Sequence, residues 1–404
     1  MPDGPHNAIP TLADLDLQGK RVLVRVDFNV PLDGDVIADD TRMTAALPTL
    51  HHLLESGASL VLVSHLGRPK GKVNPTYSLK PVAAHLAELL GRAVTLADDV
   101  VGPSARQLAA NLQPGEVLLL ENVRFEAGEE QNDADLARAL ADLADVYVND
   151  AFGAAHRAHA STAAVAGLLP HAAGLLMQAE LEALGRVVDA PEHPLVVIMG
   201  GAKISDKVGV IRQFLRDADA ILLGGGLANT FLAAQGHELG TSLVEATALD
   251  IAREIMAQAE SSRAALHLPT DMVIAPNPKA TDAVTTVAID AIPADQAALD
   301  IGPDTVAAFA AVIATAKTVV WNGPMGLFEV PPFDAGTRGI AQAISTSKAW
   351  SVVGGGDSVA AVHQSGLADA ISHISTGGGA SLELLEGKDL PGVAALRASN
   401  GGTS

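Results

Sequence analysis

The sequence predicts an α/β protein made of two doubly wound, Rossmann-like parallel-sheet lobes that are joined by a hinge helix. Short apolar runs alternate with amphipathic stretches along the chain, which is typical of parallel sheets covered by helices on both faces. Each half of the chain contains its own series of such alternating runs, and the break between the two series lies near residues 170–194. A chain of 404 residues is long enough for roughly two or three domains, and its 48% hydrophobic content suits well-packed lobes.

The first half contains five apolar runs of strand length separated by helical patterns. The predicted strands are Arg21–Val26, Leu60–Val63, Ala93–Leu96, Val117–Leu120 and Val146–Val148, and the predicted helices include Thr44–Glu55, Leu79–Leu90 and Asp133–Leu143. Strand periodicity and helical periodicity alternate along this half, so each helix is expected to cross over the sheet to the next strand.

The second half repeats the scheme. The predicted strands are Leu195–Met199, Ala220–Leu223, Met272–Ile274, Thr318–Trp321, Ser351–Val353 and Ile371–Ile374, and the predicted helices are Leu227–Ala234, Ala246–Glu260, Ala335–Ile344 and Val359–Ser365. Between the halves, a helical run over Ala172–Val188 meets Pro191 and Pro194, which end a helix and start a new segment. Residues 172–194 are therefore the predicted hinge helix and linker.

Composition and charge exclude several classes of protein. The chain has no cysteine, which rules out disulfides and thiol catalysis and fits a reducing compartment. Its net charge of -21 repels nucleic acid and anionic membranes, so neither is an expected partner. We see no signal peptide and no apolar run of about 20 residues that would span a membrane, and we expect a cytoplasmic protein.

Basic side chains follow the predicted strands of the first half, where the carboxyl ends of parallel strands form a ligand-binding edge. These residues are Arg42, Arg68, Arg124 and Arg157, together with His65 and His159. Arginine forks match phosphate and carboxylate oxygens. One arginine alone is usually a surface residue paired with an acid, but four at four strand ends of an acidic protein indicate a pocket for a small, multiply anionic ligand. Asp27 and Asn29 bind sugar-like hydroxyls or cap a turn, and Arg25, inside its strand, favours a structural role.

Glycine-rich turns follow the strands of the second half, and such turns bind phosphate through backbone N–H groups at helix N-termini. The run Gly200–Lys207 is one of them, and on a helix Lys203 and Lys207 would share a face. A strand–turn–helix corner with two solvated lysines is an equally weighted alternative. Asp357, at another such turn, is either a ligand of Mg²⁺ bridging phosphates or a helix N-cap.

The sequence disfavours two further classes of protein. The motif G-x-x-x-x-G-K-[ST] is absent. A full G-x-G-x-x-G is absent too, because Asn229 stands where the third glycine after Gly224 and Gly226 would be. This absence disfavours a two-lobed nicotinamide dehydrogenase. A non-catalytic binding or scaffold protein would be expected to lack Lys203, Arg42 or Asp357, and all three are present.

Several long motifs resemble those of the phosphoglycerate kinase family, and they are collinear with it from about residue 12 to 398. They are Val26–Pro31, Ser64–Pro69, Glu121–Phe125, Asn149–Gly153, His156–His159, Gly200–Lys203, Trp321–Pro324 and the glycine runs ending in Asp357 and Ser381. The resemblance implies phosphoryl transfer between 1,3-bisphosphoglycerate and ADP, giving 3-phosphoglycerate and ATP, with Mg²⁺ and in a monomer. It also implies that the chain after about residue 387 returns to the first lobe, so the predicted lobes are 1–171 plus 387–404 and 195–386.

The resemblance carries site roles onto matching positions of this sequence. Arg42 and Lys203 are implied to flank the transferred group. The implied glycerate site consists of Asp27, Phe28, Asn29, Arg42, His65, Leu66, Gly67, Arg68, Arg124 and Arg157. The implied nucleotide site consists of Lys207, Gly302, Asn322, Glu329, Gly355, Gly356, Asp357 and Ser358, with Asp357 also holding the metal. Ser358 stands where the family often has Thr, which keeps the hydroxyl.

In the ATP-consuming direction the attacking group is a carboxylate, which is already ionised at pH 7, so the chemistry needs no general base. Positioning and charge neutralisation of an in-line phosphoryl transfer remain as the task of the residues. The two ligands are expected on different lobes, so lobe closure about the hinge helix is expected to exclude water.

Overall fold

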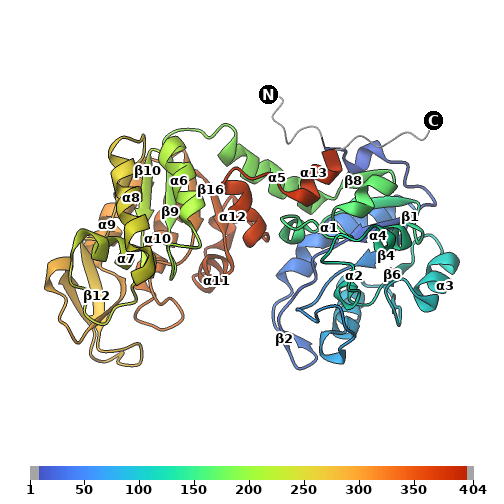
Figure 1. The fold of residues 1–404 in the computed structure, drawn as a ribbon, viewed down its shortest axis with the longest axis horizontal. Helices are drawn as coiled ribbons and strands as arrows, with labels where there is room; N and C mark the ends of the chain where they lie inside the picture. Colours follow the sequence, from blue (N-terminus) through green and yellow to red (C-terminus); the bar gives the residue numbers. More distant parts are fainter. Residues whose placement is uncertain (1–8, 398–404) are drawn as a thin grey trace. The chain divides into compact units, whose positions relative to one another are not determined.

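The computed structural model describes residues 9–397, and the chain divides into two compact units. The first unit holds the chain up to Glu182 and again from Asp389, and the second unit holds Ala183–Lys388. The ends of the predicted first lobe, residues 1–8 and 398–404, lie outside the described residues. The prediction of an α/β protein with two parallel-sheet lobes is confirmed (Figure 1).

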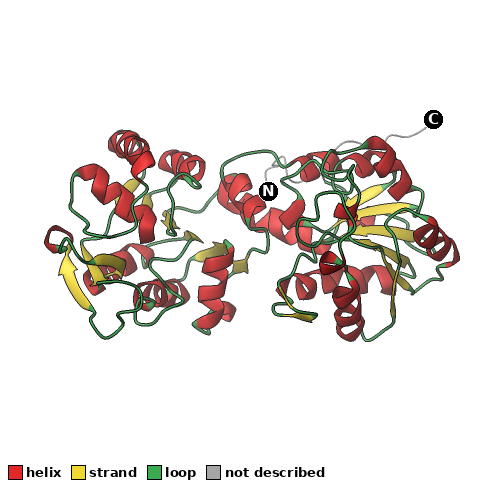
Figure 2. Cartoon of the chain, turned by 60° about the horizontal axis from the view of Figure 1, so that its bottom comes forward, coloured by secondary structure: helices red, strands yellow, loops and turns green. Residues whose placement is uncertain are grey.

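A six-stranded, wholly parallel sheet in the order β5-β6-β4-β1-β7-β8 forms the first unit. Helices cover both faces of this sheet (Figure 2). Its strands are β1 (Arg21–Arg25), β4 (Ser59–Val63), β5 (Val94–Leu96), β6 (Val117–Leu119), β7 (Val146–Asn149) and β8 (His171–Ala173), with a small hairpin of β2 (Leu32–Asp33) and β3 (Val36–Ile37) beside them. The helices are α1 (Thr41–Glu55), α2 (Lys80–Leu90), α3 (Pro103–Asn111), α4 (Ala134–Ala141) and α13 (Pro391–Arg397).

Local chemistry explains where these elements begin and end. The Asp133 carboxylate accepts the backbone N–H groups of Asp135 and Leu136 at 3.0 and 2.8 Å, which caps α4. The apolar faces of α1 and α2 pack with β1 and β4 in one continuous core that includes Met43, Leu50 and Leu86. Removing these side chains from water stabilises the unit by about 1.5–3 kcal/mol each.

The second unit has a parallel sheet in the order β11-β10-β9-β15-β16-β17, which is the doubly wound order 3-2-1-4-5-6 of a dinucleotide-binding fold. Its strands are β9 (Leu195–Met199), β10 (Ala220–Leu223), β11 (Ala265–His267), β15 (Thr318–Asn322), β16 (Trp350–Gly354) and β17 (His373–Ile374). The helices are α6 (Val208–Asp217), α7 (Gly225–Gln235), α8 (Leu249–Glu260), α9 (Pro303–Ile313), α10 (Ala335–Thr346), α11 (Gly356–Gln364) and α12 (Gly379–Leu385). The order of strands reverses between β9 and β15.

The expectation that Met272–Ile274 joins a repeat of the parallel scheme is wrong. This segment is β12 (Asp271–Ala275), which pairs antiparallel with β13 (Thr285–Ala288) and β14 (Ala297–Ile301) in a separate three-stranded sheet. No helix that could make a parallel crossover separates β12 from β13 or β13 from β14, so antiparallel pairing is the geometry available. This small sheet supplies one wall of the pocket described below.

The connector between the halves also differs from the prediction. His171–Ala173 form edge strand β8, and the helix α5 runs only over Leu175–Val188. Burial explains the strand, since all three residues of β8 are buried beside β7. The boundary between the two units falls within α5, so this helix carries the chain from one unit into the other.

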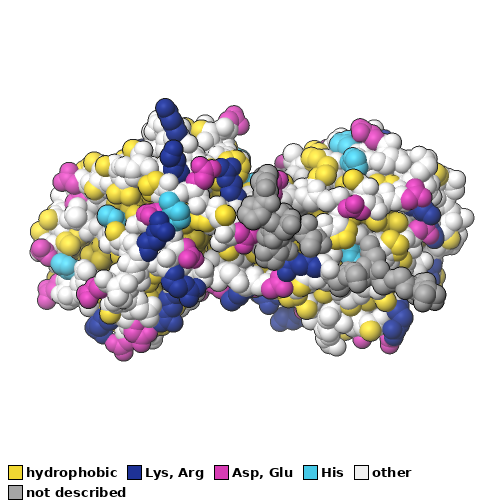
Figure 3. Space-filling model, turned by 90° about the horizontal axis from the view of Figure 1, so that it is seen from above, with side chains coloured by type: hydrophobic (Ala, Val, Ile, Leu, Met, Phe, Trp, Pro, Cys, Tyr) yellow, Lys and Arg dark blue, Asp and Glu magenta, His cyan; other side chains and the backbone are white. Residues whose placement is uncertain are grey.

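The surface carries mixed charge in spite of the large negative total. On the face shown in Figure 3, Lys and Arg side chains are interspersed with Asp and Glu. Within residues 9–397, no helix has the length and apolar character needed to cross a membrane.

Candidate functional site

The strand ends of the first unit bring most of the predicted glycerate residues to one edge of the sheet. Asp27, Phe28 and Asn29 follow β1, while His65, Leu66, Gly67 and Arg68 follow β4. Arg124 lies in the 3-10 turn Val123–Phe125, which follows β6, and Arg42 lies in the first turn of α1. A 3-10 turn over Phe152–Ala154 follows β7, and Arg157 lies three residues after that turn. Since β1, β4, β6 and β7 are adjacent and parallel, their carboxyl ends share an edge.

Hydrogen bonds connect the loops after β1 and β4. The Arg42 guanidinium donates to the Asp27 carboxylate and to the Asn29 carbonyl, each at 3.2 Å. The Asn29 side chain accepts the Gly67 N–H at 2.9 Å, and Asp27 accepts the Asn29 N–H at 3.3 Å. Asp27 and Asn29 therefore make the turn contacts that the sequence left as one alternative, and they also lie beside Arg42. Phe28 is fully buried and acts through its backbone N–H, which donates to Ser64 Oγ.

Gly67 has a conformation that a larger residue would not adopt here. Its φ is +59°, and an added Cβ would lie 2.3 Å from the Tyr77 ring. The Gly67 carbonyl accepts a hydrogen bond from Arg124 at 2.8 Å, and the Leu66 carbonyl accepts one from Asn122 at 2.7 Å. These bonds hold the loop that carries Arg68 against the loop that carries Arg124.

Arg68 and Arg157 are the two exposed arginines of the set. Within the described part of the chain, neither guanidinium makes a hydrogen bond or an ion pair. An unpaired guanidinium at the ligand edge of a sheet is available to bind an anion, whereas a surface arginine paired with an acid is not. The alternative of a surface arginine paired with an acid is therefore wrong for these two residues.

Burial and nearby positive charge both favour the neutral form of the two histidines of the site. Burial lowers the pKa of His65 well below its usual range, and the nearby Arg25, Arg124 and Arg42 lower it further. Burial lowers the pKa of His159 to about 4, with added repulsion from Arg124, Arg25 and Arg157. Arg25, Arg42, Arg124 and Arg157 therefore share one electrostatic environment around the two imidazoles.

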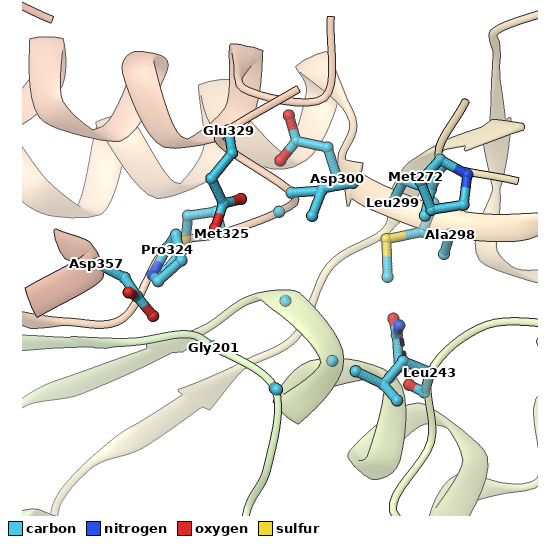
Figure 4. A pocket seen from close by; sticks show the side chains of 17 residues that line it. Gly201, Leu243, Met272, Ala298, Leu299, Asp300, Pro324, Met325, Glu329 and Asp357 are labelled. Atoms are coloured by element: carbon cyan, nitrogen blue, oxygen red, sulfur yellow. Dashed lines mark hydrogen bonds between the residues drawn. The ribbon is translucent and has the colours of Figure 1, made fainter. Parts of the chain in front are cut away.

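A pocket of about 320 Å³ lies in the second unit at the point where strand order reverses (Figure 4). Backbone from the turns after β9, β10 and β15 lines it at Gly201, Gly225 and Pro324. The small antiparallel sheet contributes Met272, Ala298 and Leu299, and Leu243 covers another side. Figure 4 shows the Glu329 and Asp357 carboxylates at one end of this pocket and the Met272 and Leu243 side chains at the other.

The predicted nucleotide residues divide into those that line this pocket and those that support it. Glu329 and Asp357 line it. Asn322 and Ser358 are buried supports, since Asn322 donates to the Gly354 carbonyl at 2.8 Å and Ser358 Oγ accepts the Gly323 N–H at 2.5 Å. Gly302 is the residue before α9 and lies against the Asp271 carboxylate, where an added Cβ would meet an oxygen at 2.1 Å.

Glycines precede and open α11 as the sequence predicts, but the role of Asp357 at this helix start differs from one of the two predicted alternatives. The residue preceding the helix is Gly355, whose φ of +91° favours glycine, and Gly356 opens the helix. Asp357 lies inside the first turn and caps no backbone N–H, so the N-cap alternative is wrong. Its exposed carboxylate makes no hydrogen bond or ion pair with the described residues.

The two lysines of Gly200–Lys207 do not share a helix face. Helix α6 begins at Val208, after both lysines, because the chain from Gly201 to Lys207 forms bends and a turn before it. Lys207 is buried, and its ammonium donates to the carbonyls of Gly200 and Asn322 at 2.8 and 2.9 Å. Burial lowers its pKa to about 8, opposed by Asp357 and Asp206. Lys203 is exposed and makes no hydrogen bond or ion pair with the described residues.

Several residues that pack around both sites could not be identified from the sequence. Leu243, Met272 and Leu299 carry no chemical signal, and only the fold brings them to the pocket. Asp300 also lines it, but its carboxylate accepts the N–H groups of Gly336 and Ile301 at 2.6 and 2.9 Å. Burial raises the pKa of Asp300 to about 8. In the first unit, the buried Glu129 and Ser161 were not identified either.

The donor set of the pocket fits a magnesium ion that a nucleotide brings with it. Among residues 9–397, no cluster of three or more His, Cys, Asp or Glu side chains suits a metal ion. Mg²⁺ keeps several waters and is usually bound through one or two carboxylates together with substrate phosphates. The free Asp357 carboxylate at the start of α11 meets that requirement.

Comparisons with known proteins agree over nearly the full chain. The family model for phosphoglycerate kinase matches residues 12–388. A phosphoglycerate kinase of Roseiflexus castenholzii is 58% identical over 388 residues, and one of Pelotomaculum thermopropionicum is 54% identical over 386, each alignment covering 96% of this chain and 98% of the relative. The solved phosphoglycerate kinase of Coxiella burnetii is 42% identical with a TM-score of 0.87, and it too covers 96% of this chain and 98% of its own. The chain therefore belongs to the phosphoglycerate kinase family and is a glycolytic kinase, a phosphotransferase with a carboxyl group as acceptor.

Proposed function

We propose that the chain transfers a phosphoryl group reversibly between 1,3-bisphosphoglycerate and ADP, giving 3-phosphoglycerate and ATP. The observation that carries this proposal is the pair of unpaired guanidinium groups, Arg68 and Arg157, at the ligand edge of the first unit in a protein of charge -21. A coupled assay that follows ATP formation from 1,3-bisphosphoglycerate and ADP tests it. A protein that binds both ligands without turnover would contradict it.

The glycerate is proposed to bind to the first unit. Arg68, Arg124 and Arg157 would bind its phosphate and carboxylate oxygens, while Asp27 and Asn29 would bind its hydroxyl. The neutral His65 and the backbone of Phe28, Leu66 and Gly67 would complete the site. The short hydrogen-bonded loops support this proposal, because they hold the donors in place before a ligand arrives.

The nucleotide is proposed to bind to the second unit. The apolar end of the pocket, at Met272 and Leu243, suits the base, and Glu329 suits the ribose hydroxyl groups. Phosphates would then meet the start of α11 at Gly355, Gly356 and Ser358, where unpaired N–H groups gather. Asn322 and Lys207 would hold the neighbouring turns, and Gly302 would support the wall of the pocket through Asp271.

The reaction is proposed to proceed in line and without a general base. In the direction of ATP formation, a β-phosphate oxygen of ADP attacks the acyl phosphate, the acyl oxygen–phosphorus bond breaks, and the leaving group is a carboxylate. No proton is transferred, so the residues act by position and charge. Arg42 and Lys203 would stabilise the transferring group. Bound Mg²⁺ would neutralise phosphate charge, with Asp357 as its protein ligand.

Direct transfer requires the two ligands to meet, and the sites belong to different units. We therefore propose that the units close during the reaction and that α5, which carries the chain between them, takes part in the hinge. Closure would exclude water, which otherwise hydrolyses the acyl phosphate. Following the family resemblance, we also propose a monomer in the cytoplasm that needs neither nucleic acid nor a membrane.

Arg68→Ala is expected to raise the KM for 3-phosphoglycerate about 10- to 100-fold, because it removes a charged hydrogen-bond donor that acts in binding. The kcat is expected to change much less. Initial rates against glycerate concentration at saturating ATP measure both constants. Arg106→Ala is the matched control, since Arg106 is an exposed arginine of α3 whose guanidinium already donates to the Val101 carbonyl. A normal KM in Arg68→Ala would contradict the assignment.

Asp357→Asn is expected to raise the Mg²⁺ concentration for half-maximal rate about 10-fold or more, since an amide is a much weaker ligand for a hard cation. Calorimetric titration with ADP, with and without Mg²⁺, provides a second readout. The variant should lose the Mg²⁺-dependent part of ADP affinity and keep the rest. Asp369→Asn, in the loop after α11, is the control. Equal Mg²⁺ dependence in the Asp357 variant and the native protein would rule out the role.

A further inference from the structure

A buried arginine lies beneath the cationic edge of the first unit. Arg25 is the last residue of β1 and only 1% exposed. Its guanidinium donates to the Val26 carbonyl and, through Nε, to Ser161 Oγ at 2.7 Å, and its Nη2 lies 3.2 Å from His65 Nδ1. Each of its three nitrogens therefore has a specific partner.

A buried carboxylate balances this charge. Glu129 is fully buried, and one of its oxygens lies 3.9 Å from Arg25 Nη2. Ser161 links the two groups, because its hydroxyl accepts from Arg25 and donates to Glu129 Oε1 at 2.6 Å, while its N–H donates to Glu129 Oε2 at 3.0 Å. A buried charge persists only where it is paired and hydrogen-bonded, as here. Glu129, Ser161 and Arg25 thus form a chain of hydrogen bonds that ends at His65.

The contact with Arg25 decides which nitrogen of His65 carries the proton. A guanidinium donates and never accepts, so the Nδ1 atom that faces it must be an acceptor. The other charged or titratable groups around His65 are Asp27, Arg42, Arg124 and the imidazole of His159. Among them only Asp27 would favour a proton on Nδ1, and its oxygen lies 3.8 Å away, beyond hydrogen-bond distance.

We propose that Arg25 is a positioning residue, which holds His65 as a neutral imidazole with its proton on Nε2, so that His65 donates one fixed hydrogen bond to the bound glycerate. This inference deepens the proposed function and rests on it for the identity of the ligand. It assigns Arg25 a task beyond the structural role that its place inside a strand suggests. The glycerate is then bound by His65 without a change in the charge of the imidazole across neutral pH.

The protonation of His65 is measurable in the intact, ligand-free protein. Nitrogen-15 NMR of the imidazole ring, with His65→Gln used to assign the signals, is expected to show an unprotonated Nδ1 and a protonated Nε2 from pH 5.5 to 8.5. Both shifts should stay constant over that range. A proton on Nδ1, or a ring that titrates within the range, would overturn the inference whatever the protein binds.

The double variant Arg25→Met/Glu129→Gln tests the cause, because it removes both buried charges and so avoids an unpaired one. Without the guanidinium, one of the causes that lower the pKa of His65 is removed and the Asp27 carboxylate can attract a proton to Nδ1, so His65 is expected to titrate at a higher pH than in the native protein. The Kd for 3-phosphoglycerate should rise about tenfold. An unchanged His65 titration in a folded double variant would overturn the inference.

Two comparisons separate this role from general stability. Arg21→Met lies on the same strand and breaks the Arg21–Asp145 ion pair of 3.1 Å, and His65 should behave as in the native protein. Arg25→Lys keeps a donor-only cation, and it should restore an unprotonated Nδ1 and part of the affinity. If the native protein has the expected tautomer but does not bind 3-phosphoglycerate, the proposed function fails and the tautomer stands.

Discussion

Lys203→Ala is expected to lower kcat about 100- to 1,000-fold, the loss of roughly 2.7–4 kcal/mol that follows removal of one preorganised donor from a developing charge. The Lys203 ammonium is exposed, has no hydrogen bond or ion pair with the described residues, and follows the glycine turn at the point where strand order reverses. Its charge is therefore available to the transferring group. Because the proposed glycerate site lies in the other unit, the Kd for 3-phosphoglycerate should stay within about twofold.

Steady-state rates in both directions and calorimetric binding of 3-phosphoglycerate measure these effects separately. Lys348→Ala is the matched control, since Lys348 is an exposed lysine of the same unit that precedes β16 at the opposite end of the sheet. A raised KM with an unchanged kcat in Lys203→Ala would remove Lys203 from the transfer step. Lys207→Met differs in kind, because the Lys207 ammonium holds two backbone carbonyls, and its loss should lower stability as well as rate.

Arg42→Ala is expected to lower kcat about 100- to 1,000-fold as well, and in addition to weaken glycerate binding about 10-fold. Arg42 reaches the site from the first turn of α1 and is held by Asp27 and by the Asn29 carbonyl, each at 3.2 Å. Its removal takes one cation from the transferring group and leaves the Asp27 carboxylate without its partner.

Arg42→Lys separates charge from geometry. It keeps the cation and loses the planar fork, and it should recover part of the lost kcat. Arg138→Ala is the control, since Arg138 is an exposed arginine of α4 that forms an ion pair with Asp135 three residues earlier. Its expected effect is within experimental error of the native rate. An Arg42→Ala variant with native kcat would refute the proposed stabilisation of the transferring group.

The buried groups behind the first site support the proposal that its histidines do not act as proton carriers. The pKa of His65 and that of His159 both fall because of burial and the surrounding arginines. A neutral imidazole suits a reaction that moves no proton. Glu129 contributes the opposing charge that allows so many cations to gather in one place.

Regular elements with a clear period were predictable from the chain alone. The strand Leu195–Met199 has the predicted bounds, and Thr41–Glu55 contains the predicted helix Thr44–Glu55, because long apolar or amphipathic runs leave few alternatives. Short elements were not predictable. His171–Ala173 is a strand because β7 lies beside it, and Ala297–Ile301 pairs with a strand more than twenty residues earlier. Pairing of this kind depends on distant chain that no local window contains.

The sequence by itself determined the doubly wound α/β class, the cationic edge of one lobe, the glycine turns of the other, and through them the family. These features depend on the types of residues and on their sequence over short stretches of the chain. Only the tertiary structure decided that Lys207 points inward to two carbonyls, that Asp357 caps nothing, and that Leu243 and Met272 form a wall of the pocket. Tertiary structure also brings Glu129 and Ser161 to Arg25 across more than 100 residues. The physical reason is that burial and partner choice belong to the packed chain, and they decide whether a charged side chain meets a ligand or holds the backbone.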